Sequence, residues 1–416
     1  MNTFLTQLEK KLTQIEADLS NLSVKEQFEL IRSKAADIIK PDLLKEKLER
    51  SRKTNQPLKI KYGIDPTGKD IHLGHIAPVI MLSRLQRLGH KIQLIFGDFT
   101  AQVGDPSGRV KSRSVLSEQE IKSNVATYKE QFAKFLDLNK TEIYYNSSFV
   151  KELTVLDLFK LYSRNRLSPL LQREDFRNRL EGLSIAETLY PTLMAIDSLA
   201  LKTDVEVGGR DQFLNFQTVV EFMERDGLET EAAVTTDLLL SLSGSGKKMS
   251  KSEGNYIALT ASPSEVFGKI MSMPDNLMEH FFKVLTEITD QDWLELIKLM
   301  DQDLNPMEVK KLLARIITAK LHSAESARQA ESQFIKVFSK DELPKDLPTI
   351  NLTPEIKNLI DLLVTAGLAA SKSQASRLIK AGAVSVYGRE KLIDTDSLPP
   401  VGSVLKVGKR KWLKIK

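Results

Sequence analysis

The segment LKIKYGIDPTGKDIHLGHIAPVIMLSRLQRLGHKIQLIFGDF, residues 58–99, decides the fold of this chain. It opens with an apolar run rich in β-forming residues, Leu58–Asp65, and closes with another, Lys91–Phe99. A helical pattern lies between the two runs. A strand, a helix and a strand within about 40 residues are typical of a right-handed βαβ unit on a parallel sheet.

Three further apolar runs extend this pattern along the chain. They are Thr141–Asn146, Asp204–Gly209 and Ala232–Leu240, and helical patterns separate them. We therefore predict a doubly wound, Rossmann-like α/β domain with a parallel sheet. The complete prediction has N-terminal helices over 1–55, the α/β domain over 56–261, an α-helical domain over 262–338, a proline-rich linker over 339–352 and a small basic α+β domain over 353–416.

The composition of the 416 residues is that of an ordinary globular protein, with 41% hydrophobic and 28% charged residues. The absence of cysteine excludes disulfides and agrees with a cytoplasmic location. No run of about 18 apolar residues and no secretory signal are present, so we expect no membrane span. The net charge is +5, and residues 353–416 carry +7. This excess indicates either a polyanionic partner or a solvated basic surface.

The stretch HLGH, which begins at His72, lies where the helix of the βαβ unit starts. In an open parallel sheet, ligands bind at the carboxyl ends of the strands, and a helix N-terminus there favours phosphate. His72 and His75 add hydrogen-bond donors, and Gly74 lets a base or ribose approach the backbone. Asp65 and Thr67 lie in the loop just before. The alternatives are a metal site, which lacks accompanying ligands, and ordinary helix-start residues.

The stretch GSGKKMSKSEGN, residues 244–255, is a second candidate for contact with phosphate. Its small residues and its lysines, Lys247, Lys248 and Lys251, are typical of a mobile cationic loop that neutralises a leaving pyrophosphate. It is not a Walker loop, because that pattern requires Ser or Thr directly after Gly-Lys. A solvated loop without a function is the alternative interpretation.

HLGH (72–75) followed further along the chain by KMSKS (248–252) resembles the two ATP-site signatures of the class I aminoacyl-tRNA synthetases. Other stretches are similar to the tyrosyl-tRNA synthetase branch in particular: GIDPTGKDIHLGH (63–75), GDFTAQVGDPSGR (97–109), LYPTLMAIDS (189–198) and DVEVGGRDQFLN (204–215). The similarity begins near residue 26 and runs to the C-terminus. It is nearest to the bacterial subgroup with a Lys-x-Gly-x-Asp-Pro start, here residues 61–66.

The resemblance implies that ATP, accompanied by Mg²⁺, activates L-tyrosine, and that a homodimeric enzyme then charges tRNA(Tyr). The implied catalytic residues are His72, His75, Lys248, Lys251, Arg109, Arg113 and Thr67. The implied ATP-binding residues are Asp65, Gly74, Gly209, Asp211, Met249 and Lys248. The implied amino-acid-binding residues are Lys61, Gly63, Asp105, Tyr190, Met194, Asp197 and Gln212. No metal held by the protein itself is expected.

Individual roles follow from the same resemblance. Asp105 and Tyr190 are expected to hold the substrate α-ammonium, and Asp197 is expected to accept a hydrogen bond from the phenol hydroxyl. Lys61 is expected near Asp197, where it partly neutralises the carboxylate. The two Arg residues after GDPSG are expected to reach the pyrophosphate.

The sequence departs from the family pattern at three positions. Met194 and Ile196 stand where Gln and Tyr are usual, and Arg210 stands where Thr or Ser is usual. Because the usual Gln helps to bind the α-ammonium, Met194 predicts a raised KM for tyrosine. Two alternatives stay open: a paralogue that activates a different aromatic acid, and a non-catalytic RNA-binding protein with a synthetase fold.

The C-terminal stretch from 370 to 397 and the basic end that follows resemble a small RNA-binding domain. Such a domain occurs in a ribosomal small-subunit protein, in pseudouridine synthases and in many bacterial tyrosyl synthetases. The predicted RNA-contacting residues are Lys372, Arg377, Lys380, Lys409, Arg410 and Lys411. Trp412 is expected to pack on its own domain rather than to stack on a base. The helical domain is expected to meet the anticodon arm.

Overall fold

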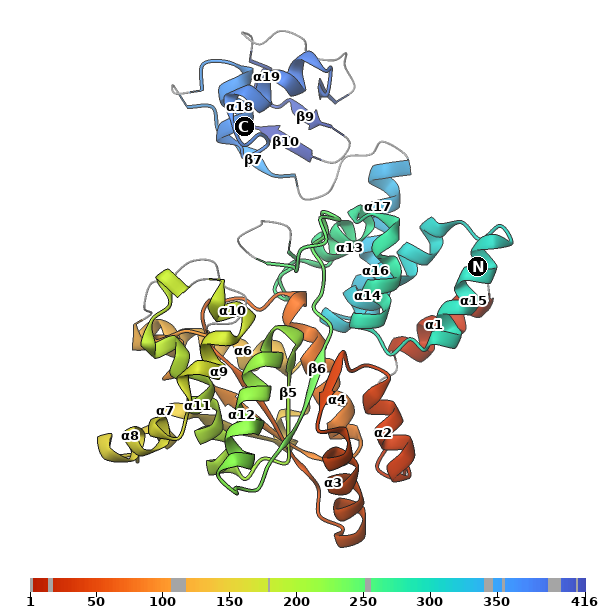
Figure 1. The fold of residues 1–416 in the computed structure, drawn as a ribbon. Coiled ribbons are helices and arrows are strands. Elements are labelled where there is room, and N and C mark those ends of the chain that lie inside the picture. Colours follow the sequence, from red (N-terminus) through yellow and green to blue (C-terminus); the bar gives the residue numbers. More distant parts are fainter. Residues whose placement is uncertain are drawn as a thin grey trace. The chain divides into compact units, whose positions relative to one another are not determined.

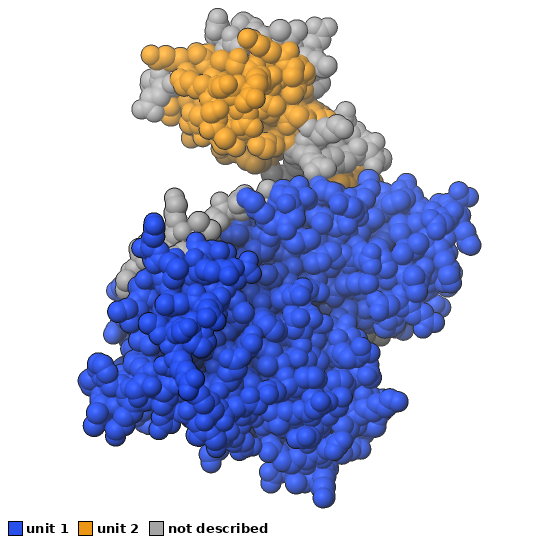
Figure 2. Space-filling view, viewed as in Figure 1, with its two compact units in different colours: residues 1–331 blue, residues 332–416 orange. Residues whose placement is uncertain are grey.

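The structure is a computed structural model that describes residues 3–13, 18–105, 117–178, 180–250, 256–339, 347–353, 356–387, 398–408 and 411–416 (Figure 1). The chain forms two compact units, residues 1–331 and residues 332–416, which Figure 2 shows in blue and orange. Each unit has its own sheet. Among the described residues, none of the helices is both long enough and apolar enough to cross a membrane.

Six strands form the sheet of the first unit, in the order β1-β6-β5-β2-β3-β4. Their bounds are β1 Asp37–Ile39, β2 Lys59–Ile64, β3 Lys91–Phe96, β4 Thr141–Tyr145, β5 Val205–Gly209 and β6 Ala232–Thr236. All neighbouring strands run parallel except β1, which pairs antiparallel with β6. The order reverses between β2 and β5, so the predicted doubly wound sheet is confirmed and its switch point lies between these two strands.

Helices and short 3₁₀ turns connect these strands (Figure 1). They are α2 Val24–Arg32, α3 Pro41–Thr54, η1 Leu73–His75, α4 Ile76–Arg87, α5 Thr100–Val103, α6 Glu118–Phe132, η2 Leu138–Lys140, α7 Asn146–Lys151, α8 Val155–Ser163, α9 Leu167–Gln172, α10 Glu174–Arg177, η3 Leu180–Gly182, α11 Ile185–Leu201, η4 Arg210–Gln212 and α12 Phe213–Arg225.

Two of these helices position the site. Most residues of α4 are buried, from Ile76 through Leu82, as expected of a helix that is apolar on nearly every side. Its N-terminus is therefore fixed at the carboxyl edge of the sheet. α11 begins with a capping box, in which the Ser184 side chain accepts from the Glu187 backbone and Glu187 reaches back to Ser184. This box sets the phase of the helix and so the face that it turns to the sheet.

The α-helical region follows the sheet, as predicted. Its elements are α13 Pro263–Ser272, η6 Asp275–Leu277, α14 Met278–Leu285, α15 Asp290–Asp301, α16 Pro306–Leu321 and α17 Ala324–Ser339. The N-terminal helix α1 Thr3–Thr13 also belongs here, because it packs against α16. Ion pairs join Glu9 to Arg315 at 3.0 Å and Lys11 to Asp292 at 2.7 Å.

The N-terminal segment 1–55 was predicted to contain only helices, and the structure differs from this prediction in two ways. Its first helix completes the α-helical region, and Asp37–Ile39 form the edge strand β1. So short a strand cannot show an alternating pattern, and the contact of α1 with α16 joins segments from opposite ends of the first unit's sequence. Neither feature had a local signal that could be recognised in the sequence.

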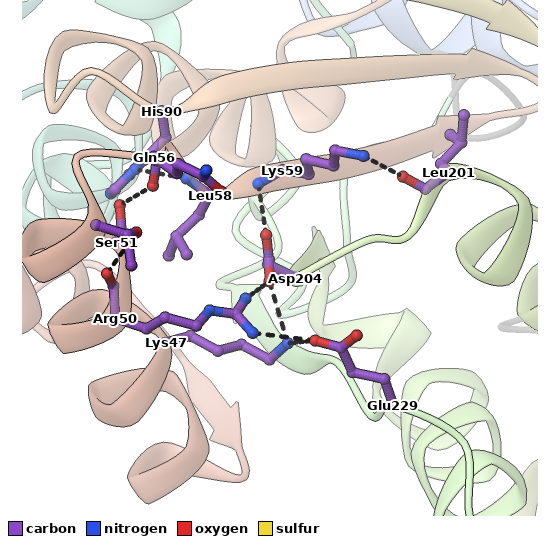
Figure 3. Close-up of polar contacts among 11 residues, drawn as sticks. Lys47, Arg50, Ser51, Gln56, Leu58, Lys59, His90, Leu201, Asp204 and Glu229 are labelled. Atoms are coloured by element: carbon purple, nitrogen blue, oxygen red, sulfur yellow. Dashed lines mark hydrogen bonds and ion pairs between the residues drawn. The ribbon is translucent and has the colours of Figure 1, made fainter.

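Asp204, which directly precedes β5, ties α3 to the amino end of the sheet (Figure 3). Its carboxylate accepts hydrogen bonds from Lys47 Nζ at 3.2 Å, from the Lys59 backbone N–H at 3.0 Å and from Arg50. Arg50 also pairs with Glu229 at 3.0 Å. The Lys47 ammonium is buried, so this carboxylate compensates a charge that water does not reach.

Replacing Asp204 with alanine is expected to lower the free energy of unfolding by about 3 kcal/mol, because it leaves the buried Lys47 without its nearest carboxylate. Glu229 is a matched control, since its side chain is exposed and lies 3.9 Å from the same ammonium. Glu229→Ala is expected to cost less than about 1 kcal/mol. Urea denaturation followed by circular dichroism measures both variants, and equal losses would contradict this interpretation of the network.

The C-terminal unit has a four-stranded sheet in the order β7-β10-β9-β8. Its elements are β7 Thr349–Ile350, α18 Leu359–Thr365, α19 Lys372–Lys380, β8 Val384–Val386, β9 Val404–Val407 and β10 Lys411–Ile415. Strand β7 lies in the predicted linker 339–352 but pairs with β10, so the sheet begins earlier than the sequence indicated. Trp412 is 6% exposed and packs within this unit, as expected.

Candidate active site

A cavity of about 740 Å³ lies at the carboxyl ends of the central strands, at the switch point of the sheet. Every predicted catalytic, ATP-binding or amino-acid-binding residue that the structure describes lines it: Lys61, Gly63, Asp65, Thr67, His72, Gly74, His75, Asp105, Tyr190, Met194, Asp197, Gly209, Asp211, Gln212, Lys248 and Met249. The remaining predictions, Arg109, Arg113 and Lys251, lie outside the described residues.

Backbone hydrogen bonds join the two signature motifs. The Leu73 N–H donates to Ile257 O at 2.9 Å, and the Leu259 N–H donates to Ile71 O at 2.9 Å. Within KMSKS, the Met249 N–H donates to Leu239 O at 2.7 Å. The start of the lysine motif and the segment that follows it are therefore both fixed, the latter on the HLGH segment. This arrangement explains how two motifs that lie far apart in the sequence build one site.

The HLGH turn is closely packed around its glycine. His72 Nδ1 accepts a hydrogen bond from the Gly74 N–H at 3.1 Å, and the imidazole centroids of His72 and His75 lie 3.9 Å apart. A Cβ at position 74 would lie 2.8 Å from the His72 ring, so a side chain there would displace the imidazole. The turn thus presents the backbone at the start of α4, and both imidazoles line the same cavity.

Lys248 and Asp211 form an ion pair across the cavity, with Lys248 Nζ 2.8 Å from Asp211 Oδ2. Asp211 lies in the short turn η4 at the end of β5, beside Gly209. A Cβ on Gly209 would approach Asp211 Oδ1 to 2.7 Å, so this glycine makes room for the carboxylate. The residue predicted to meet the leaving pyrophosphate therefore contacts the residue predicted to hold the ribose.

At the next part of the cavity, a chain of polar side chains holds Asp105. Gln212 Nε2 donates to Asp105 Oδ2 at 2.8 Å, and Asn215 Nδ2 lies 3.4 Å from Asp105 Oδ1. Asn215 is itself fixed by Arg173, whose guanidinium donates to Asn215 Oδ1 at 2.8 Å. The carboxylate predicted to bind the α-ammonium is thus held in one orientation from two sides.

Asp65 belongs with this group as much as with the predicted ATP-binding group. Its carboxylate accepts from Tyr190 OH at 3.1 Å and from Thr100 Oγ1 at 2.6 Å. Gly97 makes the space for it, because a Cβ there would lie 2.1 Å from Asp65 Oδ1. Burial is the largest cause of the raised pKa of the Tyr190 phenol. The nearby carboxylates of Asp65 and Asp105 raise this pKa further.

Asp197 forms the far end of the cavity. It lies on the face of α11 that also carries Tyr190 and Met194, at intervals of four and three residues. Asp197 is 6% exposed, and its Oδ1 has no hydrogen-bond partner among the residues that the structure describes. Burial raises its pKa to about 7, against the attraction of Lys61 and a hydrogen bond with Asn146. This free acceptor in an enclosed pocket suits a hydrogen-bond donor on the substrate.

Lys61 forms its direct ion pair with Glu206. Its Nζ lies 2.9 Å from Glu206 Oε1, and the two residues are register partners on the adjacent strands β2 and β5. The same ammonium donates to Met194 O at 3.1 Å and to Ser198 Oγ. The direct ion pair of Lys61 is therefore with Glu206, and its charge also lowers the pKa of Asp197, in agreement with the expected partial neutralisation.

The two unusual residues on α11 have different positions. Met194 lines the cavity, so its replacement of the usual glutamine changes the site directly. Ile196 is buried in an apolar cluster with Val150 and Leu193, outside the cavity lining. Only Met194 is therefore placed to change the amino-acid pocket.

Sequence reasoning missed four polar residues that support the site: Thr100, Asn146, Glu206 and Asn215. Asn146 directly follows β4, and its side chain donates to Thr100 Oγ1 at 3.0 Å. Its place just after a strand on the carboxyl edge was a signal that could have indicated it. Glu206 is recognisable only once β5 is known to lie beside β2.

Among the described residues, no group of three or more His, Cys, Asp or Glu side chains could hold a metal ion. In the C-terminal unit, Lys372, Arg377 and Lys380 are exposed on α19, and Lys372 pairs with Asp361 at 2.9 Å. Lys411 on β10 is exposed and donates to Leu368 O at 3.0 Å. The predicted Lys409 and Arg410 lie outside the described residues.

Comparison with known proteins assigns both units. Residues 53–339 match the family described as tRNA synthetases class I (W and Y), and residues 340–412 match the Tyrosine–tRNA ligase SYY-like C-terminal domain. The tyrosine–tRNA ligase of Thermotoga maritima is 39% identical over 400 residues, which cover 95% of this chain and 98% of that protein. The tyrosine–tRNA ligase of Carboxydothermus hydrogenoformans is 41% identical over 404 residues, covering 94% of this chain and 98% of that protein.

Solved structures show the same fold. A C-terminally truncated mitochondrial tyrosyl-tRNA synthetase from Aspergillus nidulans matches with a TM-score of 0.63 and 23% identity, over 80% of this chain and 97% of that chain. The tyrosyl-tRNA synthetase of Archaeoglobus fulgidus, complexed with L-tyrosine, matches with a TM-score of 0.61 and 24% identity, over 74% of this chain and 99% of that chain.

The chain therefore belongs to the class I aminoacyl-tRNA synthetases, enzymes that ligate an amino acid to tRNA. Both signature motifs of that class lie on one cavity at the switch point of its sheet. Its similarity to tyrosine–tRNA ligases over about 95% of its length places it in that family.

Proposed function

We propose that this tyrosine–tRNA ligase binds ATP and L-tyrosine side by side in the cavity, with the roles set out below. The observation that carries the proposal is the composition of that one cavity. It combines the HLGH turn, the pair formed by Lys248 and Asp211, and the buried carboxylate of Asp197. The first group suits a triphosphate, the second suits pyrophosphate and ribose, and the third suits a phenol hydroxyl.

In the first step, an oxygen of the tyrosine carboxylate attacks the α-phosphorus of ATP, and the bond to the bridging oxygen of pyrophosphate breaks. His72 and His75, at the start of α4, stabilise the phosphate charge as it redistributes. Lys248 leaves Asp211 and meets the departing pyrophosphate, while Asp211 becomes free to accept hydrogen bonds from the ribose. Mg²⁺ enters as part of the substrate, bound to the phosphates of ATP.

Three carboxylates and one phenol fix the amino acid. Asp105, oriented by Gln212, faces the α-ammonium together with Tyr190 and Asp65. Asp197 accepts the hydrogen bond of the phenol hydroxyl at the other end of the pocket. Met194 offers no polar atom on its side chain, so the ammonium is held without the amide that is usual there. In the second step, the tyrosyl group passes from the adenylate to a hydroxyl of the terminal tRNA ribose, and AMP leaves.

Pyrophosphate exchange with a panel of amino acids tests the substrate assignment. ATP formation from labelled pyrophosphate is expected with tyrosine. Exchange with no amino acid at all would contradict activation in this cavity and would favour a protein that only binds RNA. Exchange with another aromatic acid in place of tyrosine would contradict the substrate. Since tRNA charging takes place with cytoplasmic tRNA, we also propose a cytoplasmic location.

The basic C-terminal unit is proposed to bind the tRNA backbone through Lys372, Arg377 and Lys380. Removing residues 340–416 is expected to leave pyrophosphate exchange within about threefold and to weaken tRNA charging, because only phosphate contacts are lost. The cut precedes β7, so no strand of the C-terminal sheet stays behind. The slope of tRNA affinity against salt concentration should fall, and an unchanged slope would contradict the assignment.

We propose that the chain forms a homodimer, as the family resemblance implies, and the first unit offers a candidate surface for the contact. Large apolar side chains are exposed on three helices, with exposed fractions from 58% to 80%: Val155, Leu156 and Phe159 on α8, Leu167 on α9 and Ile185 on α11. None of the residues of α8 is buried, and this helix lies at the margin of the sheet domain in Figure 1. Exposed apolar side chains gathered in this way are typical of protein–protein contacts.

We expect the unaltered protein to sediment as a dimer at micromolar concentration, and replacing Phe159 with glutamate is expected to produce monomers under the same conditions. Leu294 is the matched control, since it is exposed to 58% but lies on α15, far from these helices in the sequence. Leu294→Glu is expected to remain dimeric. Analytical ultracentrifugation measures both, and a dimeric Phe159 variant would exclude this surface.

A further inference from the structure

Behind the ring end of the amino-acid pocket lies a buried group of one lysine and three carboxyls. It consists of Lys61 on β2, Glu206 on β5, Glu231 just before β6 and Asp197 on α11. All four are at most 6% exposed. If every carboxyl were ionised, the group would carry a net charge of −2 away from water, so at least one carboxyl holds a proton at neutral pH. The distribution of the single positive charge therefore decides how each carboxyl behaves.

The ammonium of Lys61 has no donor left for a substrate. It has three N–H donors, and it contacts three acceptors: Glu206 Oε1 at 2.9 Å, Met194 O at 3.1 Å and Ser198 Oγ. The pair with Glu206 is fixed by the parallel register of β2 and β5. The other two acceptors lie on successive turns of α11, the helix that carries Asp197.

Glu231 is a second buried carboxyl that attracts the Lys61 ammonium. No donor among the described residues reaches either of its carboxyl oxygens, and the remaining oxygen of Glu206 has none either. Burial raises the pKa of Glu206 well above its usual range, Lys61 opposes that rise, and Glu231 adds to it. Among these carboxyls, Glu206 is the one that contacts the Lys61 ammonium directly.

Asp197 is the other carboxyl that competes for Lys61. The attraction of Lys61 already lowers the pKa of Asp197 against the effect of burial, which shows that the two charges act on each other. The charges of Asp65 and Asp98 add to the rise of that pKa. Besides Glu206, the carboxyls that attract Lys61 are Glu231 and then Asp197, and of these two only Asp197 lines the cavity. If Lys61 lost its partner on β5, an ion pair with Asp197 would occupy the acceptor.

We propose that Glu206 is a specificity-determining positioning residue, which holds the Lys61 ammonium away from Asp197 and so keeps that carboxylate available to the ring-end hydroxyl of the substrate. The proposal rests on the role of Asp197 given above. It assigns Glu206 no contact with the reacting atoms. Its effect is on the choice of amino acid and on the KM for that amino acid, and not on the phosphate chemistry.

Glu206→Gln tests the proposal, because glutamine keeps the size of the side chain and removes its charge. We expect the KM for tyrosine to rise at least tenfold and the preference for tyrosine over phenylalanine in kcat/KM to fall at least tenfold. The KM for ATP should stay within twofold. Glu231→Gln is the matched control: it removes a buried carboxyl of the same group but leaves the contact between Lys61 and Glu206, so the preference should be kept.

Restoration gives a result that a purely structural role would not produce. Adding Lys61→Met to Glu206→Gln removes the released ammonium, and the preference for tyrosine should return to within threefold of the unaltered enzyme. If Glu206→Gln does not fold, Ser198→Ala removes one acceptor of Lys61 without a change of charge, and a loss of preference of about threefold is expected.

Full preference in the folded Glu206→Gln or Ser198→Ala variant, or no restoration in the double variant, would overturn the role of Glu206. These outcomes differ from failure of the proposed function. In that case the unaltered enzyme itself would not prefer tyrosine to phenylalanine.

Discussion

Replacing Asp197 with asparagine is expected to reduce the preference for tyrosine over phenylalanine by about 10- to 100-fold, the effect of losing a hydrogen bond to a charged acceptor in an enclosed site. The amide still fills the space but no longer offers a carboxylate to the phenol. Pyrophosphate exchange with each amino acid measures kcat/KM, and the KM for ATP serves as the internal control. An unchanged preference would contradict the role of Asp197 at the ring end.

The same substitution is expected to stabilise the protein at high pH. Burial raises the pKa of Asp197 from 3.8 to about 7, so between these values the folded state keeps a proton that the unfolded state has lost. Stability therefore falls as the pH rises from about 4 to about 7 and stays reduced above that. Asparagine has no such penalty, so its advantage over aspartate should grow by about 2 to 3 kcal/mol between pH 5 and pH 8.

Urea denaturation of both proteins at the two pH values measures this difference. Using the difference between variant and unaltered protein removes the contribution of all other titrating groups. An advantage that did not change with pH would show that Asp197 is ionised in the folded protein at both values. A gain in stability together with a loss of specificity would be the pattern expected of a buried functional charge.

Lys248→Ala is the second change with a large expected effect. It should slow formation of the adenylate by roughly 2 to 4 kcal/mol of barrier, because the pyrophosphate loses a cation in the transition state. Tyrosine binding without ATP should be unchanged, since Lys248 pairs with Asp211 on the nucleotide side of the cavity. Rapid-quench measurement of adenylate formation and equilibrium binding of tyrosine separate the two effects.

Lys247 is the matched control for this loop. It directly precedes Lys248, is exposed and does not line the cavity. Lys247→Ala is expected to change the rate of adenylate formation by less than about threefold. If both lysines had the same effect, or if Lys248→Ala weakened tyrosine binding as much as it slowed the reaction, the loop would have a structural role and not the proposed one.

The parts of the fold that were predictable have strong local signals. The longer strands of the first sheet were found close to their observed bounds, because each lies in a run rich in β-forming residues. The edge strand β1 and strand β7 were missed, since both are very short and exist only through their partners β6 and β10. The packing partner of the N-terminal helix could not be predicted for the same reason: α16 lies near the other end of the first unit's sequence.

In the candidate site, too, the residues with a local sequence signal were predicted and the contacts made through the fold were not. The HLGH turn, Lys248 and the carboxylates were identified because their motifs are contiguous in the sequence. The direct ion pair of Lys61 with Glu206 was not predicted, since Glu206 reaches it only through the order of β2 and β5 in the sheet. The position of Ile196 was also not evident, because a single step along α11 separates the cavity face from the apolar cluster.

The ratio of kcat/KM for tyrosine and for phenylalanine, measured by pyrophosphate exchange with the unaltered enzyme, tests the central claim most directly. No donor in the described part of the chain reaches the buried Oδ1 of Asp197, and phenylalanine would leave it unpaired. A preference for tyrosine of at least about 100-fold is therefore expected. Equal rates with the two amino acids would contradict the claim that Asp197 recognises the phenol hydroxyl.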